Sequence, residues 1–228
     1  MDYNRFLELF WEFNEFIVSL HTLYLDSVVG FKILHQRLLE HQNQIKSFIG
    51  ECEEASGEFQ DKCEIDYGLL CGKNFNVVSM SPLMKQGEVK QRTAHNGTNY
   101  ILMGRLCVVQ AYTYWETYLR KEIAIALGVL DSKVHTEEKE IERILGKYVS
   151  IDFWGDMRLM RHAILHKNGT ATSDFDKMKF LTWFKPDNPI NLDFEKMRFI
   201  FTQMGNFRNT LHCLSLSPSN AKFPPKNC

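Results

Sequence analysis

The sequence lacks the cysteine spacing that is expected of a metal site. Its six cysteines are Cys52, Cys63, Cys71, Cys107, Cys213 and Cys228. None of them forms a C-x-x-C pair or a Cys/His cluster of zinc-finger spacing, which argues against a zinc site. Disulfide scaffolds are usually shorter and denser in cysteine, so we expect reduced cysteines, with Cys107 packed as a small hydrophobe in an apolar helical run.

An excess of charge of one sign is also lacking. The 27 Lys and Arg residues are balanced by 28 Asp and Glu residues, which gives a formal net charge of -1. A chain with this charge balance lacks the generally basic surface that binds nucleic acid nonspecifically. A local basic groove is still compatible with this composition, because the local potential is what attracts a polyanion.

No basic segment followed by an apolar block begins the chain, and no long apolar run is free of polar groups. The most apolar stretch, Ile101 to Leu119, contains Arg105, Gln110 and Glu116. Central charges are costly in lipid, so this stretch predicts a buried helix and no membrane span. We therefore expect a cytoplasmic protein.

Strand-like alternation is absent as well, whereas apolar residues recur at helical spacing. The first 49 residues predict one long helix or two helices broken near Gly30. Other helices are predicted near 51–64 and at about 99–127, 136–146, 151–167 and 192–214, with a short segment at 174–182 and turns at 79–82 and 185–190. The expected fold class is an all-α helical bundle, with a helical extension and connection (1–90), a helical core (91–214) and a disordered tail (215–228).

The segment from Asp156 to Gly169 concentrates the residues that could carry chemistry, namely Arg158, Arg161, His162, His166, Lys167 and Asn168. A solvated helix face is the simplest interpretation. Metal binding is a second, because His162 and His166 have the spacing of the zinc ligands in H-E-x-x-H. The position of the catalytic Glu in that motif is Ala163 here, and neighbouring arginines repel a divalent cation, so neither a metal nor another cofactor is expected.

A third interpretation is metal-independent cleavage of RNA, which supplies its own 2′-OH nucleophile. An arginine can hold a phosphate through two hydrogen bonds, and a histidine can exchange protons near neutral pH. Arg161 and His166 are separated by about 140° around an ideal helix, so they reach one phosphate only if the helix loosens or a second copy faces the first.

The Arg161-x4-His166 pattern, followed by Asn168-Gly169, resembles the signature of HEPN domains. The segment Tyr112 to Arg120, with Trp115-Glu116, is similar to an early helix of bacterial HEPN-like proteins. The resemblance implies a dimeric helical bundle, and many members of the family are metal-independent ribonucleases. The residue after the arginine is usually Asn or Asp in that family, whereas it is His162 here.

The resemblance further implies a role for each matched residue. Arg161 would grip the scissile phosphate, and His166 would be the general acid or base. His162 and Asn168 would be supporting polar contacts, and Glu116 would face the catalytic helix or form a surface ion pair with Arg120. Arg158 would be a phosphate anchor or an ion-pair partner of Asp156 or Glu116.

Other side chains could contribute to RNA binding. Four aromatic residues could stack on bases, although core packing is the favoured interpretation for Trp154, Phe175, Trp183 and Phe184. Four lysines could flank a groove, namely Lys167, Lys177, Lys179 and Lys185.

The function expected from the resemblance is a metal-independent endoribonuclease that leaves a 2′,3′-cyclic phosphate and acts as a homodimer in a toxin or antiphage role. An antitoxin or regulatory partner is compatible with that role. The alternatives are a non-catalytic HEPN-like module for dimerisation or binding of RNA or nucleotides, and a structural scaffold whose residues 1–49 bind a partner.

Overall fold

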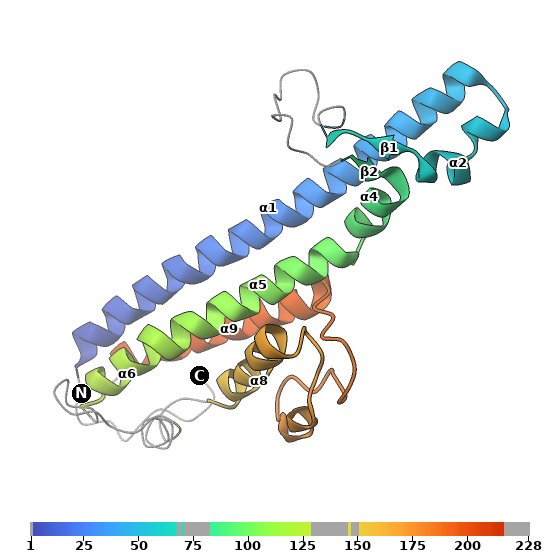
Figure 1. Cartoon of the computed structure of the whole chain (residues 1–228). Helices are drawn as coiled ribbons and strands as arrows, with labels where there is room; N and C mark the ends of the chain where they lie inside the picture. The colour runs from blue at the N-terminus through green and yellow to red at the C-terminus, as the bar shows by residue number, and fades with distance from the viewer. Residues whose placement is uncertain (1, 68–69, 71–82, 129–145, 147–150, 217–228) are drawn as a thin grey trace. The chain divides into compact units, whose positions relative to one another are not determined.

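The computed structural model describes residues 2–67, 70, 83–128, 146 and 151–216 of the chain. Their secondary structure is mostly helical, as the sequence predicts. The longer helices are α1 (Tyr3–Ile49), α4 (Gln86–Thr93), α5 (Thr98–Tyr114), α6 (Arg120–Ala126), α8 (Asp152–His166) and α9 (Phe194–Leu216) (Figure 1). The shorter elements are η1 (Glu53–Ala55), α2 (Gly57–Lys62), the one-turn π-helix η2 (Trp115–Leu119) and the 3₁₀-helix η3 (Ser173–Lys177).

The helix boundaries follow the stop signals in the sequence. Gly128, Asn168 and Gly169 adopt positive φ angles of 71°, 50° and 71°, directly after the helices that they were expected to end. Gly30 does not interrupt α1, and a Cβ added there would meet nothing within 4 Å. Glycine in a helix interior costs only about 1 kcal/mol, which the rest of a 47-residue helix offsets.

The mostly helical chain also contains two short strands, which the sequence pattern did not indicate. Strands β1 (Glu64–Ile65) and β2 (Met84–Lys85) form an antiparallel pair, with Glu64 opposite Lys85 and Ile65 opposite Met84. Each strand has two residues, which is too short to produce an alternating pattern. The predicted helix at 136–146 and the turn at 79–82 lie outside the described residues, apart from residue 146, and α9 continues through Leu216 into the predicted tail.

The chain divides into two compact units, and both of the segments predicted as extension and core contribute to each unit. The first unit comprises Met1–Thr22 and Gly104–Cys228, and the second comprises Leu23–Met103. In the first unit, the rings of Trp115 and Trp154 are stacked with centroids 4.7 Å apart, and Phe207 meets both rings edge-on at 5.5 Å. Phe13 of α1 contacts Trp154 and Phe207, so this aromatic cluster joins four helical segments.

The second unit has a smaller core, in which Leu38, Ile65, Leu70 and Val89 pack together. Beside this core the buried Gln42 amide donates to Asp61 and to Gln86, and Lys90 also donates to Asp61. Burial alone would raise the pKa of Asp61, but the hydrogen bonds from Gln42 and Lys90 outweigh it and hold the pKa below its ordinary value. The polar network therefore favours the ionised carboxylate.

Within the described part of the chain, α1 is the one helix long and apolar enough to cross a membrane by length and composition. Core helices of soluble proteins also meet that test, and α5, which contains most of the apolar stretch discussed above, does not meet it. Cytoplasmic localisation stays a prediction.

Candidate functional site

Helix α8 presents two faces of different character. Its apolar face is buried and comprises Phe153, Trp154, Met157, Met160 and Ala163. Its other face carries Arg158, His162, Leu165 and His166, all of which are exposed. The helix ends with the N–H groups of Lys167 and Gly169 both bonded to the carbonyl of Ala163. Asn168 adopts the left-handed conformation directly after the helix, and asparagine tolerates this conformation better than most residues do.

The structure brings His162 and His166 together on the exposed face. Their ring centroids are 4.9 Å apart, with an angle of 44° between the ring planes. Arg158 precedes His162 by one helical turn, so the three side chains form a continuous polar stripe. Imidazoles that are accessible to solvent can exchange protons with a ligand, and an adjacent guanidinium can hold an anion.

Arg161 lies on a different side of α8 from His166, because five residues of a regular helix correspond to about 140° of rotation. Its guanidinium lies over the ring of the buried Tyr112, with Cζ 5.9 Å from the ring centroid. Its Nη1 is 3.8 Å from the Glu116 carboxylate, and both side chains are 30% exposed. Arg161 and His166 are therefore both reachable from solvent but are not drawn together within one chain.

Glu116 belongs to the π-helical turn η2, a type of distortion that is frequently found at functional sites. Its carboxylate faces Arg161 of α8, which is the orientation that the sequence resemblance implies for this residue. Arg158 forms no ion pair with Glu116 or Asp156, nor with any other residue in the described ranges. Arg158 is exposed, and it lies near enough to Asp174 to lower the pKa of that carboxyl.

Asp156 has a structural role that the sequence did not reveal. Its carboxylate is buried and accepts hydrogen bonds from three successive backbone N–H groups, at 3.2 Å from Lys179 and at 2.7 Å from both Phe180 and Leu181. The available signal was an aspartate at helical spacing among Phe153, Met157 and Met160 on the apolar face. A carboxylate in such a position requires partners from elsewhere in the chain.

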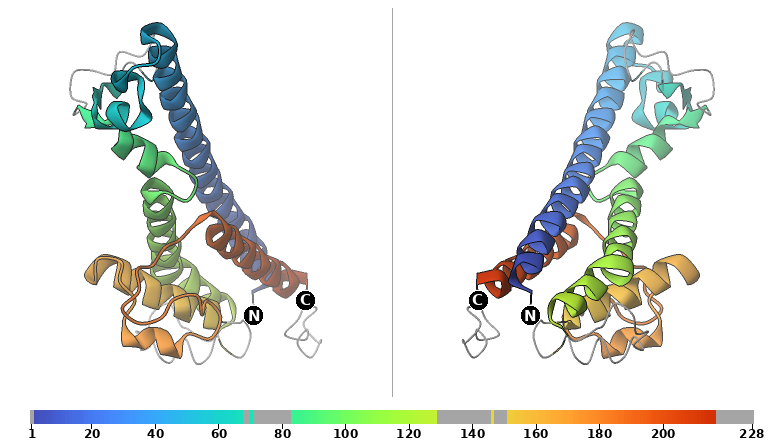
Figure 2. Two further views of the ribbon diagram at one scale, coloured as in Figure 1. Left: turned by 90° about the vertical axis from the view of Figure 1, so that its right-hand side faces the viewer. Right: turned by 90° about the vertical axis from the view of Figure 1, so that its left-hand side faces the viewer.

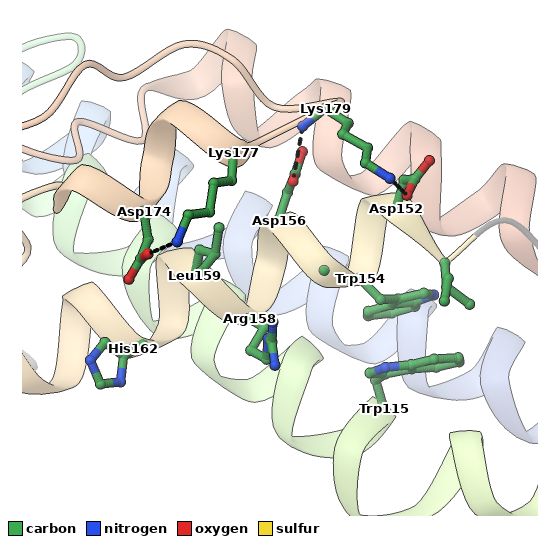
Figure 3. A pocket seen from close by; sticks show the side chains of 12 residues that line it. Trp115, Asp152, Trp154, Asp156, Arg158, Leu159, His162, Asp174, Lys177 and Lys179 are labelled. Carbon is green, nitrogen blue, oxygen red and sulfur yellow. Dashed lines mark hydrogen bonds and ion pairs between the residues drawn. The ribbon is translucent and has the colours of Figure 1, made fainter. Parts of the chain in front are cut away.

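The three hydrogen bonds attach the segment after α8 to the side of this helix, and Figure 2 shows that segment folded back beside α8. The segment and α8 line an open cavity of about 600 Å³. Helix α8 contributes Asp152, Trp154, Asp156, Arg158 and His162, the following segment contributes Asp174, Lys177 and Lys179, and η2 contributes Trp115 (Figure 3). His162 therefore belongs both to the imidazole pair and to the rim of this cavity.

The remaining candidates separate into core residues and surface residues. Trp154, Phe175 and Phe184 are buried, as the core-packing interpretation requires, and Trp183 is half-buried with its ring against Phe199. The four lysines are exposed, and Lys177 and Lys179 are the two that line the cavity.

No group of three or more His, Cys, Asp or Glu side chains that could hold a metal ion occurs among the residues that the structure describes. Comparison of the chain with models of protein families, with curated proteins and with solved structures gives no match. The function must therefore be inferred from the chemistry of the side chains on and around α8.

Proposed function

We propose that the chain is a metal-independent endoribonuclease of HEPN type whose site is the exposed face of α8. The observation that carries this proposal is the pair of accessible imidazoles, His162 and His166, with ring centroids 4.9 Å apart and with Arg158 one turn away. Cleavage of RNA by its own 2′-OH requires one group to remove a proton, one to supply a proton, and a cation for the phosphate. The two imidazoles of this face can carry out the two proton transfers, and Arg161 of the same helix can supply the cation.

In the proposed reaction one imidazole removes the proton of the 2′-OH, and O2′ forms a bond to phosphorus. The bond from phosphorus to O5′ breaks, and the other imidazole donates its proton to O5′. The products are a 2′,3′-cyclic phosphate and a 5′-OH end. Arg161 stabilises the charge on the phosphoryl oxygens, and Glu116 and Tyr112 hold its guanidinium in place.

The working form that we propose is a homodimer in which Arg161 of one copy and His166 of the other face the same phosphate. Two features support it. The two side chains diverge around α8 within one chain, and Leu165, which precedes His166, is 48% exposed. A two-fold axis near this face repeats every residue of the site, so divergent side chains of one copy can meet those of the other.

Cleavage of a mixed RNA pool by the purified chain in the presence of EDTA tests the activity. The variant His166→Ala should lose at least about a hundredfold in rate, since proton transfer by a positioned side chain contributes 10²–10⁴-fold. His212→Ala, at a histidine outside the face, is the matched control and should retain the wild-type rate. Undiminished cleavage by His166→Ala would remove this residue from the mechanism.

Complementation tests whether the site is shared between copies. Arg161→Ala and His166→Ala should each be inactive alone, and a mixture that exchanges subunits should recover roughly a quarter of the wild-type activity, because half of the dimers are mixed and each has one intact site. A mixture that stays inactive despite exchange of subunits contradicts a shared site.

The alternative function is a non-catalytic module that binds RNA or nucleotides. The engagement of Arg161 with Glu116 and Tyr112 favours it, because this guanidinium already has partners in the absence of a phosphate. RNA that is bound by the wild-type chain but is never cut would select this alternative.

A further inference from the structure

We propose that the cavity beside α8 is a subsite for an unpaired nucleobase, with guanine as its best complement. This inference rests on the proposed function, since it concerns the nucleotide next to the scissile phosphate. The cavity lies entirely within the first compact unit of the chain. Its volume of about 600 Å³ is within the range of small-molecule sites.

The charges that line the cavity fit a base better than a phosphate. Lys177 is paired with Asp174 at 2.6 Å, and Lys179 is paired with Asp152 at 2.9 Å. The buried Asp156 carboxylate is occupied by three backbone N–H groups. The lining is thus close to neutral but rich in donors and acceptors, which is what the edge of a nucleobase requires.

Arg158 determines which base the cavity suits. It is the one arginine of the lining, and its guanidinium has no ion pair in the described ranges. An exposed guanidinium fork matches the O6 and N7 acceptors of guanine, the commonest specific contact between arginine and a base. Guanine also carries N–H donors on its Watson–Crick edge, and the carboxylate of Asp174, which lines the same cavity, can accept from them.

Trp154 supplies an independent sign that a ligand belongs here. This residue is 1% exposed and lines the cavity, and its ring N–H has no hydrogen-bond partner within the described part of the chain. Buried donors are rarely left unpaired, because desolvation without a partner costs about 1–3 kcal/mol. An acceptor atom of a bound base would satisfy this group.

The cavity also has the correct relation to the proposed reaction. Arg158 lies between Trp154 and His162 along α8, and His162 continues the row to the imidazole pair (Figure 3). One helical turn separates Arg158 from His162, about 5–6 Å between their Cβ atoms. In the proposed complex, the base contacts Arg158 and its phosphate lies toward His162 and His166.

Titration calorimetry of the full chain with the 3′-monophosphates of guanosine, adenosine, cytidine and uridine tests the subsite, because none of these compounds can be cleaved. The guanosine compound should bind about tenfold more tightly than the other three. Arg158→Lys keeps the charge but loses the fork, so it should abolish this preference. Arg198→Lys, at an exposed arginine of α9 outside the cavity, should leave the preference unchanged.

Trp154→Phe provides a second variant, which retains an aromatic ring but removes the N–H donor. It should weaken binding of guanosine 3′-monophosphate by roughly fivefold, the loss of about one hydrogen bond. Circular dichroism of each variant shows whether the fold is retained. Equal affinity for the four nucleotides, absence of binding, or a preference that survives Arg158→Lys would overturn the subsite.

The two proposals can fail separately. Cleavage of RNA without a base preference at the cut, together with no nucleotide binding, refutes the subsite and leaves the nuclease. Preferential binding of the guanosine compound by a chain that never cuts RNA supports the subsite and refutes the nuclease.

Discussion

Replacement of Asp156 is the sharpest test of how the cavity is built. In the native chain its carboxylate accepts from the backbone N–H groups of Lys179, Phe180 and Leu181, two of them at 2.7 Å. Hydrogen bonds to a charged acceptor contribute about 1.5–3 kcal/mol each, and loss of the acceptor leaves buried donors without partners. The N–H of Leu181 is buried, and the other two are partly buried.

From these contacts we expect Asp156→Ala to lower the free energy of unfolding by about 4.5 kcal/mol, the lower end for three such bonds. Asp156→Asn keeps one acceptor oxygen but turns an NH₂ group toward the backbone donors, so about 2 kcal/mol should be lost. Urea unfolding followed by circular dichroism measures both changes. Asp176→Asn, an exposed aspartate of η3, is the matched control and should change stability by less than about 0.5 kcal/mol.

A local measurement separates this mechanism from a general loss of packing. In Asp156→Asn, amide hydrogen exchange at Phe180 and Leu181 should become faster than in the wild type, while exchange in α9 should change less. If Asp156→Asn unfolds with the wild-type free energy and these amides keep their protection, then the carboxylate does not hold the segment to α8.

Two further predictions concern titratable groups whose pKa is changed by burial. Burial lowers the pKa of His21, which packs against Phe201 with ring centroids 4.4 Å apart. As the pH falls below about 6.5, the unfolded chain binds a proton that the native chain resists, so stability should fall by less than the limiting 1.4 kcal/mol per pH unit. His21→Gln should reduce this loss between pH 7.5 and 5.5 in urea unfolding, and an unchanged pH dependence would contradict the burial effect. Burial raises the pKa of the Cys107 thiol to about 12, so iodoacetamide at pH 8 should modify the exposed Cys52 in the native chain and Cys107 only after unfolding. Peptide mapping by mass spectrometry measures both, and rapid native labelling of Cys107 would refute the prediction.

The sequence predicted those parts of the fold that depend on local chemistry. The end of α8 could be predicted because Asn168 and Gly169 favour the left-handed backbone that stops a helix, and both adopt it. The buried face of α9 could be predicted because Met197, Met204, Phe207 and Leu211 recur at helical spacing, and all four are buried. Whether α1 breaks at Gly30 could not be decided, because the cost of a helical glycine is small beside the packing of so long a helix.

Features that depend on residues distant in the sequence could not be predicted. The role of Asp156 depends on the backbone of residues 179–181, which folds back against α8. No local sequence pattern predicts this long-range contact. Likewise, the sequence could place Arg161 and His166 on one helix but could not show that Arg161 turns toward Glu116. The adjacency of His162 and His166 did follow from their spacing of four residues, but no local pattern indicated a cavity at His162.

The two ends of the segment between α8 and α9 are bonded to each other. The N–H of Ile190 bonds to the carbonyl of Gly169, and Thr170 pairs with Pro189. Arg105 of α5 donates to the carbonyls of both Gly169 and Ile190. Because both ends of this loop are bonded to the same arginine and its middle is bonded to Asp156, its exposed positions can change while its backbone stays in place. Since Lys177 and Lys179 lie on this loop, evolution or protein engineering can alter what the neighbouring cavity accepts without rebuilding the helices that support it.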